Sequence, residues 1–244
     1  SMLPFTRINR NIRSLKRYRQ VLGVLIKYGF GHIVEQLNID YYLELGKRIV
    51  SLGTASRDLE RLSHSERMRL ALEELGPTFI KLGQLLSTRP DVIPADYIEE
   101  LKKLQDRVPA VATEQILAQI HYELGRPVEE LFDRFETVPL ATASIAQVHR
   151  GTLKSGEEVV FKIRRPEIDQ VIETDVDILM GLAYLMDKHL PGGEMYDPIG
   201  LVKEFRRTIN RELDFAREGR TIDRFSENFS DDETVRIPQV YWEY

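Results

Sequence analysis

One lysine and one glutamate, far apart in the chain, have the setting that phosphate binding requires. Lys162 lies in the apolar run Val159–Ile163, and Glu218 follows much later in a charged segment. Burying a lysine is costly unless an anion neutralises it. We therefore expect Lys162 to be a buried cation that pairs with Glu218, and we expect the pair to hold the phosphate groups of a nucleotide.

Four small residues before this strand predict a turn beside it. They are Ala141, Thr142, Ala143 and Ser144. A strand over about 145–152 follows, and the Lys-Ser-Gly-Glu sequence at 154–157 predicts a hairpin turn into the lysine-bearing strand. Two antiparallel strands that fold a small-residue turn over a lysine are the geometry of a kinase amino-terminal lobe. The alternative is an ordinary hairpin with an exposed lysine.

A second group of polar residues lies on a predicted helix that begins near Pro77. Lys81 and Gln84 are three residues apart, so they project from one helix face. Gly83 stands between them, and a glycine inside a helix costs about 1 kcal/mol of helix propensity. This cost indicates that another backbone or a ligand comes close there. The alternative is a surface lysine beside a glycine used for packing.

Three acids fall within one predicted helix that begins near Pro198. Asp214 and Glu218 lie one turn apart on the same face, whereas Glu212 is rotated by about 200° from Asp214 at helical pitch. We expect Glu212 or Asp214 to meet a cation from elsewhere, and Lys81 is the candidate. The alternative is a solvated charged face on which Arg211 and Arg217 are local partners.

The remaining pattern predicts an α+β fold in two parts. Residues 1–136 are expected to be a helical extension, and residues 137–244 a lobe with a small antiparallel sheet. The pattern Ser-His-Ser-Glu at 63–66 is a capping box. Further helices are predicted over 113–124, 127–135 and 167–190, and a strand over 236–244.

Composition excludes several classes of function. The chain has 244 residues, a formal net charge of -5 and no cysteine. The charge argues against a nucleic-acid-binding protein. The absence of cysteine excludes disulfides and zinc–thiolate sites and favours the cytoplasmic side as location. The five histidines lack ligand spacing, so no metal site of the protein's own is expected. No apolar run reaches the roughly 20 residues of a membrane span.

The first twenty residues carry six cations and no carboxylate. They are Arg7, Arg10, Arg13, Lys16, Arg17 and Arg19. A basic amphipathic helix is able to lie on an anionic membrane surface. The alternative is a solvated helix face packed on its own domain. Ser1 and Met2 are interpreted as the remnant of a removed tag.

Three motifs in register give the chain a family resemblance. Lys81–Gln84 is similar to the KxGQ motif of the UbiB family, residues 141–149 to its alanine-rich nucleotide loop, and Glu212–Asp214 to its ExD motif. UbiB proteins are atypical protein-kinase-like proteins linked to the biosynthesis of ubiquinone and related quinones. The resemblance extends through residues 77–218.

The resemblance implies a kinase-like amino-terminal lobe that binds ATP with magnesium, covered by a helical extension that carries KxGQ. Lys162 and Glu218 would position phosphates, while Lys81, Gly83 and Gln84 would regulate the site through Glu212 or Asp214. It also implies an atypical kinase or ATPase that is peripheral to, or anchored at, a membrane in the full-length protein.

The chain stops at Tyr244, before the catalytic loop and the metal-binding aspartate of such proteins. We therefore expect this 244-residue chain to lack turnover, to bind ATP and magnesium weakly or not at all, and to self-associate through exposed lobe surface. The competing hypothesis is a non-catalytic helical module that binds a membrane surface or a partner and contains a degenerate lobe. The sequence does not identify the phosphoryl acceptor or the quinone.

Overall fold

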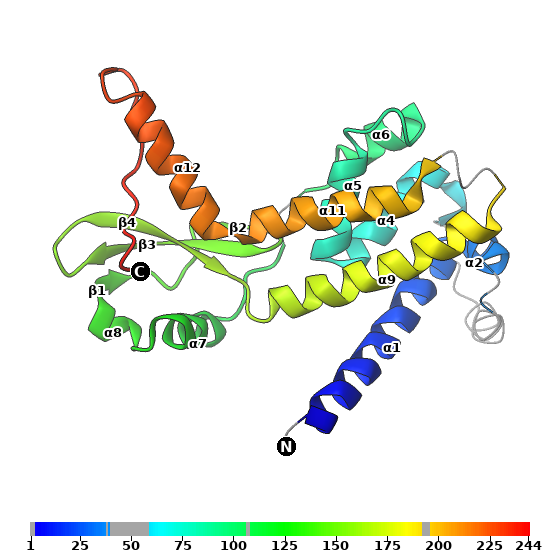
Figure 1. The fold of residues 1–244 in the computed structure, drawn as a ribbon, viewed down its shortest axis with the longest axis horizontal. Coiled ribbons are helices and arrows are strands. Elements are labelled where there is room, and N and C mark those ends of the chain that lie inside the picture. Colours follow the sequence, from blue (N-terminus) through cyan, green and yellow to red (C-terminus); the bar gives the residue numbers. More distant parts are fainter. Residues whose placement is uncertain (1–2, 38, 40–58, 106–107, 192–195) are drawn as a thin grey trace. The chain divides into compact units, whose positions relative to one another are not determined.

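The structure, a computed structural model, describes residues 3–37, 39, 59–105, 108–191 and 196–244 (Figure 1). Its fold is α+β, and it divides into two compact units. Unit 1 contains residues 1–109, 142–144 and 167–205, and unit 2 contains residues 110–141, 145–166 and 206–244. These units differ from a division at residue 136. Residues 110–136 belong to the unit that contains the sheet, and residues 167–205 belong to the helical unit. The predicted tag remnant, residues 1 and 2, lies outside the described residues.

Unit 1 is built from helices. They are α1 (Leu3–Lys27), α2 (Gly31–Gln36), the 3-10 turn η1 (Leu59–Arg61), α4 (His64–Leu75), α5 (Pro77–Leu86), α6 (Ala95–Leu101), α9 (Ile168–His189) and the first half of α11 (Pro198–Leu213). Apolar side chains at helical spacing form its core, among them Leu22, Leu101 and Phe205, each at most 1% exposed. In the described parts of the chain, no helix is both long and apolar enough to cross a membrane.

Unit 2 is organised around a small sheet. Its strands are β1 (Phe132–Phe135), β2 (Ala141–Thr142), β3 (Ala146–Leu153) and β4 (Glu158–Arg164). Strand β3 is central and pairs antiparallel with both β1 and β4, and Val148 stands opposite Lys162 in the β3–β4 register. The predicted hairpin is therefore present. Residues 132–135, which the sequence predicted as the end of a helix, instead pair with β3 as a strand, and Phe132 packs in the core beneath the sheet.

Helices α7 (Thr113–Leu124) and α8 (Val128–Leu131) supply the rest of that core. Ile116 and Ile120 of α7 pack with Leu131, Phe132 and Leu153. The alternating side chains Val159, Phe161 and Ile163 of β4 pack against the same cluster. Because side chains alternate along a strand, residues 160 and 162 belong to the opposite face. This alternation decides which face of the sheet carries the lysine.

The acidic segment predicted as one helix is broken. Helix α11 ends at Leu213, and α12 (Phe215–Asn228) begins after Asp214, whose φ of -85° and ψ of 84° are not helical. The expected rotation between Glu212 and Asp214 on a straight helix is therefore wrong. The Asp214 carboxylate accepts a hydrogen bond from the backbone N–H of Arg217 at 2.9 Å, which makes it the N-cap of α12.

The last residues of the chain return from the end of α12 to the sheet (Figure 1). The sequence predicted a strand over 236–244, and this prediction is wrong. The segment has no strand pairing. Its side chains attach it instead, because Tyr241 packs against the core of unit 2 and the ring centroids of Tyr244 and Phe132 lie 5.2 Å apart.

Candidate nucleotide site

The predicted ion pair between Lys162 and Glu218 is present. The Nζ atom of Lys162 lies 2.5 Å from the Oε2 atom of Glu218. Strand β4 supplies the lysine from the sheet face opposite the core, and the first turns of α12 supply the glutamate. Residues 56 positions apart in sequence therefore meet in unit 2.

Phe215 completes the surroundings of the lysine. Its ring centroid lies 4.6 Å from the Lys162 Nζ atom, which is a cation–π contact. Phe215 and Glu218 are three residues apart on α12 and thus share one face of the helix. Phe215 was not among the residues predicted from the sequence, although its spacing of three residues from Glu218 is a usable signal.

The expectation that Lys162 is buried is wrong. Its side chain is 40% exposed and that of Glu218 is 48% exposed. Strand β4 has no fully buried residue, because only one of its faces packs on the core. An ion pair this accessible contributes about 0–1 kcal/mol to folding. The pair therefore adds little to stability, and its ammonium group is accessible to an anion from solvent.

A buried polar network lies in the same sheet. The Nδ1 atom of His149 lies 2.8 Å from the carbonyl oxygen of Glu136, and its Nε2 atom lies 3.1 Å from the Nε2 atom of Gln147. The Gln147 side-chain oxygen accepts a hydrogen bond from the backbone N–H of Val111. These partners assign the His149 proton to Nδ1. The network joins β3 to the segments before α7 and after β1.

The small-residue loop forms strand β2 and the turn that follows it. Ala141 is exposed, whereas Ser144 is fully buried. Among the described non-glycine residues only Glu167 and Asp197 have positive φ. The loop therefore follows a backbone path that alanine adopts without strain. Its role in holding a nucleotide stays a prediction.

The KxGQ residues lie on α5 in unit 1. Lys81 and Gln84 are both partly exposed. Gly83 is buried, and a Cβ atom on it would lie 2.3 Å from the Cδ1 atom of Leu104 and 2.8 Å from that of Leu72. The glycine is thus explained by packing within unit 1, which is the alternative that the sequence left open. The predicted contact of Lys81 with Glu212 or Asp214 stays a prediction.

Comparisons with known proteins agree with these features. A family model described as the ABC1 atypical kinase-like domain matches residues 103–244. A protein named "Probable protein kinase UbiB" from Aeromonas salmonicida is 40% identical over 233 residues, which are 95% of this chain and 42% of that protein. A protein of the same name from Marinobacter nauticus is 45% identical over 184 residues, which are 75% of this chain and 34% of that protein.

Two further proteins are similar. An uncharacterized protein from Synechocystis is 44% identical over 184 residues, 75% of this chain and 32% of that protein. The solved complex of Rv3197 with erythromycin from Mycobacterium tuberculosis is 29% identical, covers 69% of this chain and 43% of that chain, and has a TM-score of 0.47. The chain spans less than half the length of these curated relatives.

Proposed function

This chain belongs to the ABC1 atypical kinase-like family, and from that premise we propose that it binds ATP with magnesium through Lys162, Glu218 and the loop at 141–144. The whole protein would be an atypical kinase or ATPase of the UbiB type that supports the biosynthesis of ubiquinone or a related isoprenoid quinone. The contact between Lys162 and Glu218 is the observation that carries the proposal.

The chemistry of the pair suits a phosphate. An ammonium group has three donors, and Glu218 occupies one of them at 2.5 Å. The other donors are accessible because the side chain is 40% exposed. Hydrogen bonds between a cation and a phosphate oxygen are about twice as strong as neutral ones. In this arrangement Glu218 orients the lysine, and Lys162 binds the nucleotide phosphates.

The alanines of the loop at 141–144 change how a nucleotide would be held. A glycine-rich loop lets backbone N–H groups approach phosphates closely, whereas each alanine adds a Cβ atom in the way. With Ala141 and Ala143 in these positions, the nucleotide would be held more by Lys162 and less by the loop backbone. We therefore propose that affinity depends strongly on the charge of Lys162.

Magnesium would enter with the nucleotide. This ion usually keeps several waters and binds through one or two carboxylates plus substrate phosphates. Within the described ranges, no three side chains of the kinds that ligate metals gather. Glu212 and Asp214 are exposed carboxylates. These residues fit an ion held mainly by phosphate oxygens, and its chemistry would be to shield phosphate charge.

Regulation by the KxGQ helix is part of the proposal. Lys81 and Gln84 share one partly exposed face of α5. A lysine that reaches the carboxylate of Glu212 or Asp214 would occupy the place of metal and substrate charge, and would thereby gate the site. The competing hypothesis, a non-catalytic module with a degenerate lobe, predicts a separated pair, and the contact of Lys162 with Glu218 favours the nucleotide site over it.

Titration of the 244-residue chain with MgATP tests the proposal. Emission of Trp242, the single tryptophan, or calorimetry reports binding. We expect Lys162→Met to lower the affinity for ATP about tenfold or more, because a charge-assisted hydrogen bond is worth about 1.5–3 kcal/mol. The matched control is Lys154→Met in the hairpin turn of the same two strands, where affinity should not change.

Two results would overturn the proposal. One is an ATP affinity of Lys162→Met equal to that of the wild type. The other is the absence of measurable binding by the wild-type chain at millimolar MgATP, because we propose that this chain binds the nucleotide weakly rather than not at all. Repeating the titration with AMP separates phosphate recognition from base recognition, because AMP lacks the β- and γ-phosphates and should depend less on Lys162.

A further inference from the structure

Trp242 contacts the helix that carries Glu218. A Cβ atom on Gly219 would lie 2.7 Å from the Cη2 atom of Trp242 and 3.1 Å from its Cζ2 atom, so the indole ring rests directly on the helix backbone. The indole N–H donates a hydrogen bond to the Oδ2 atom of Asp223 at 2.8 Å. Gly219 is the single buried residue of α12. The indole is therefore packed and hydrogen-bonded at two points of one helix.

The two points fix the rotation of α12 about its axis. Gly219 and Asp223 are four residues apart and lie on one face, one turn above the other. Glu218 directly precedes Gly219, so its side chain projects from the helix about 100° around the axis from the position of Gly219. A rotation that moved Glu218 off Lys162 would also push the indole off Gly219 and stretch the bond to Asp223.

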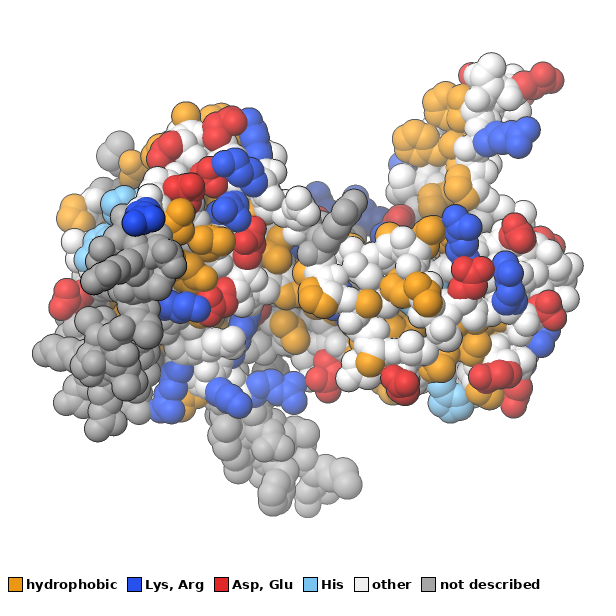
Figure 2. Space-filling model, turned by 180° about the vertical axis from the view of Figure 1, so that it is seen from behind, with side chains coloured by type: hydrophobic (Ala, Val, Ile, Leu, Met, Phe, Trp, Pro, Cys, Tyr) orange, Lys and Arg blue, Asp and Glu red, His pale blue; other side chains and the backbone are white. Residues whose placement is uncertain are grey.

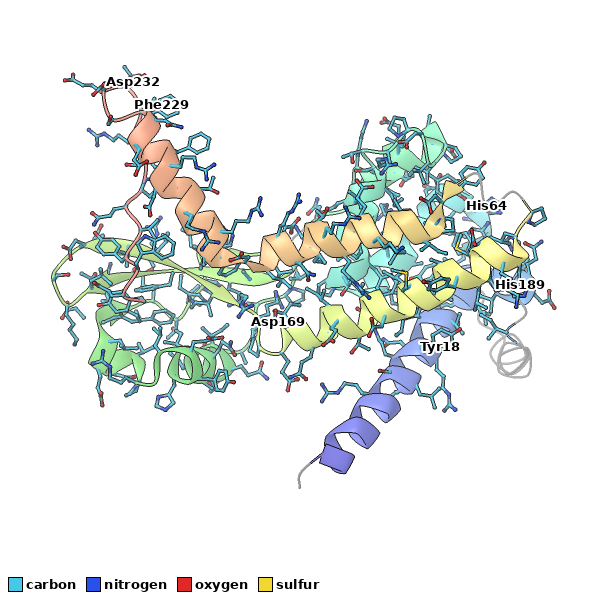
Figure 3. All side chains as sticks on the ribbon, viewed as in Figure 1. Tyr18, His64, Asp169, His189, Phe229 and Asp232 are labelled. Carbon is cyan, nitrogen blue, oxygen red and sulfur yellow. The ribbon has the colours of Figure 1, made fainter. Side chains whose placement is uncertain are left out.

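The far end of α12 offers no comparable attachment among the residues described. Phe229 and Asp232 lie at the end of the helix that projects away from the sheet (Figure 3). Phe225 and Phe229 stack on each other, with ring centroids 6.1 Å apart, and remain 50% and 39% exposed. Hydrophobic side chains on this projecting helix are visible in the space-filling view (Figure 2). The position of Glu218 must therefore be set from the first nine residues of α12, which include Gly219 and Asp223.

The segment that bears Trp242 is itself anchored on the sheet. Tyr241 packs against the core of unit 2, and the Tyr244 ring contacts Phe132 of β1. Because its segment packs on the sheet and its ring packs on α12, the indole fixes α12 relative to the sheet. The sheet carries Lys162, and α12 carries Glu218. The exposed ion pair is too weakly stabilising to hold a helix by itself.

We propose that Trp242 is a positioning residue, which holds α12 in the rotation that brings Glu218 onto Lys162. Gly219 is the complementary element, because any larger residue would displace the indole. The geometric part of the proposal stands on the contacts above. Its consequence for phosphate binding rests on the proposed function, since the pair orients phosphates only if a nucleotide binds there.

Zero-length cross-linking measures the pair without a nucleotide. A carbodiimide joins a lysine and a carboxylate in contact as an amide, and peptide mass spectrometry quantifies each product. The measured quantity is the yield of the Lys162–Glu218 product divided by that of Lys27–Glu74, an ion pair of unit 1 at 2.7 Å. We expect this ratio to fall at least threefold in Trp242→Ala and in Gly219→Ala. Asp223→Asn, which keeps an oxygen acceptor, should retain most of it.

Phe225→Ala is the matched control, because it removes an exposed aromatic ring from the same helix and should leave the ratio unchanged. A wild-type ratio in both Trp242→Ala and Gly219→Ala would overturn the proposal, and so would an equal fall in Phe225→Ala. MgATP titration of the same variants separates the two hypotheses. If the ratio falls but the wild-type chain binds no ATP, the proposed function fails and the positioning role stands.

Discussion

The guanidinium group of Arg17 donates two hydrogen bonds to the carboxylate of Asp175, at 2.7 and 3.0 Å. It donates a third to the carbonyl oxygen of Leu75 at 2.5 Å and lies over the ring of Phe79. Asp175 is fully buried. One arginine of the basic amino-terminal run thus joins α1 to α4, α5 and α9 inside unit 1. Arg13 also contacts α9, through Gln170.

Removing Arg17 should destabilise unit 1 strongly. Arg17→Met leaves the buried carboxylate of Asp175 without its counter-charge, and breaking a buried pair on one side costs about 3–5 kcal/mol. The double variant Arg17→Met/Asp175→Leu should recover most of that loss. Urea denaturation gives the free energies of unfolding. Lys16→Met, at the exposed neighbouring position, is the control. A loss below 1 kcal/mol in Arg17→Met would contradict this account.

Gly83 should tolerate alanine badly. The added Cβ atom would lie 2.3 Å from Leu104 and 2.8 Å from Leu72, and overpacking a core costs about 1–3 kcal/mol. Gly181 in α9 is the matched control, because a Cβ atom there meets nothing within 4 Å. Gly181→Ala should stabilise the protein by about 0.5–1 kcal/mol through helix propensity. Equal unfolding free energies for the two variants would show that Gly83 is not a packing residue.

Glu100 should make unit 1 sensitive to acid. The hydrogen bond from Lys103 lowers the pKa of Glu100 below its ordinary value of 4.5; partial burial opposes this, and the bond from Arg69 of α4 adds to it. Because the folded-state pKa is depressed, the stabilisation is present above pH 4.5 and is lost as pH falls through the folded-state pKa.

Glu100→Gln tests this dependence. At pH 7 the variant should be less stable than the wild type by about 0.5–1 kcal/mol, and the difference should shrink below pH 4.5. Thermal unfolding at several pH values measures it. Glu99→Gln is the control on the same helix, because Glu99 is 72% exposed and pairs with Lys102, only three residues further along the chain. A larger loss of stability at pH 7 in Glu99→Gln than in Glu100→Gln would show that Glu100 is not the acid-sensitive group.

We propose that Arg7, Arg10 and Lys16 of the basic amino-terminal run bind an anionic membrane surface on the cytoplasmic side. Replacing Arg7, Arg10 and Lys16 by glutamine should weaken pelleting with vesicles rich in phosphatidylserine, because each cation near such a surface contributes about 1 kcal/mol. Arg17 is kept, since it holds Asp175. Neutral vesicles are the control. Equal pelleting of both proteins with anionic vesicles would remove the membrane proposal.

The sequence determined features that depend on neighbouring residues. The capping box is present, because Ser63 accepts from the Glu66 backbone and Glu66 accepts from that of Ser63. Helix α7 ends at Gly125, whose φ of 72° is a left-handed conformation that glycine adopts freely. Alternation along β4 and the three motifs likewise indicated the sheet and the family. Such signals are local, so they can be read without coordinates.

The tertiary structure decided which distant groups meet. It broke the acidic helix at Asp214, left Lys162 partly exposed on the sheet face opposite the core and placed Trp242 on Gly219. It also paired Arg17, one cation of the basic amino-terminal run, with the buried carboxylate of Asp175. Each outcome depends on the packing of segments that are remote in sequence. Charge and periodicity show that a side chain needs a partner, but only the folded backbone determines which partner lies within reach.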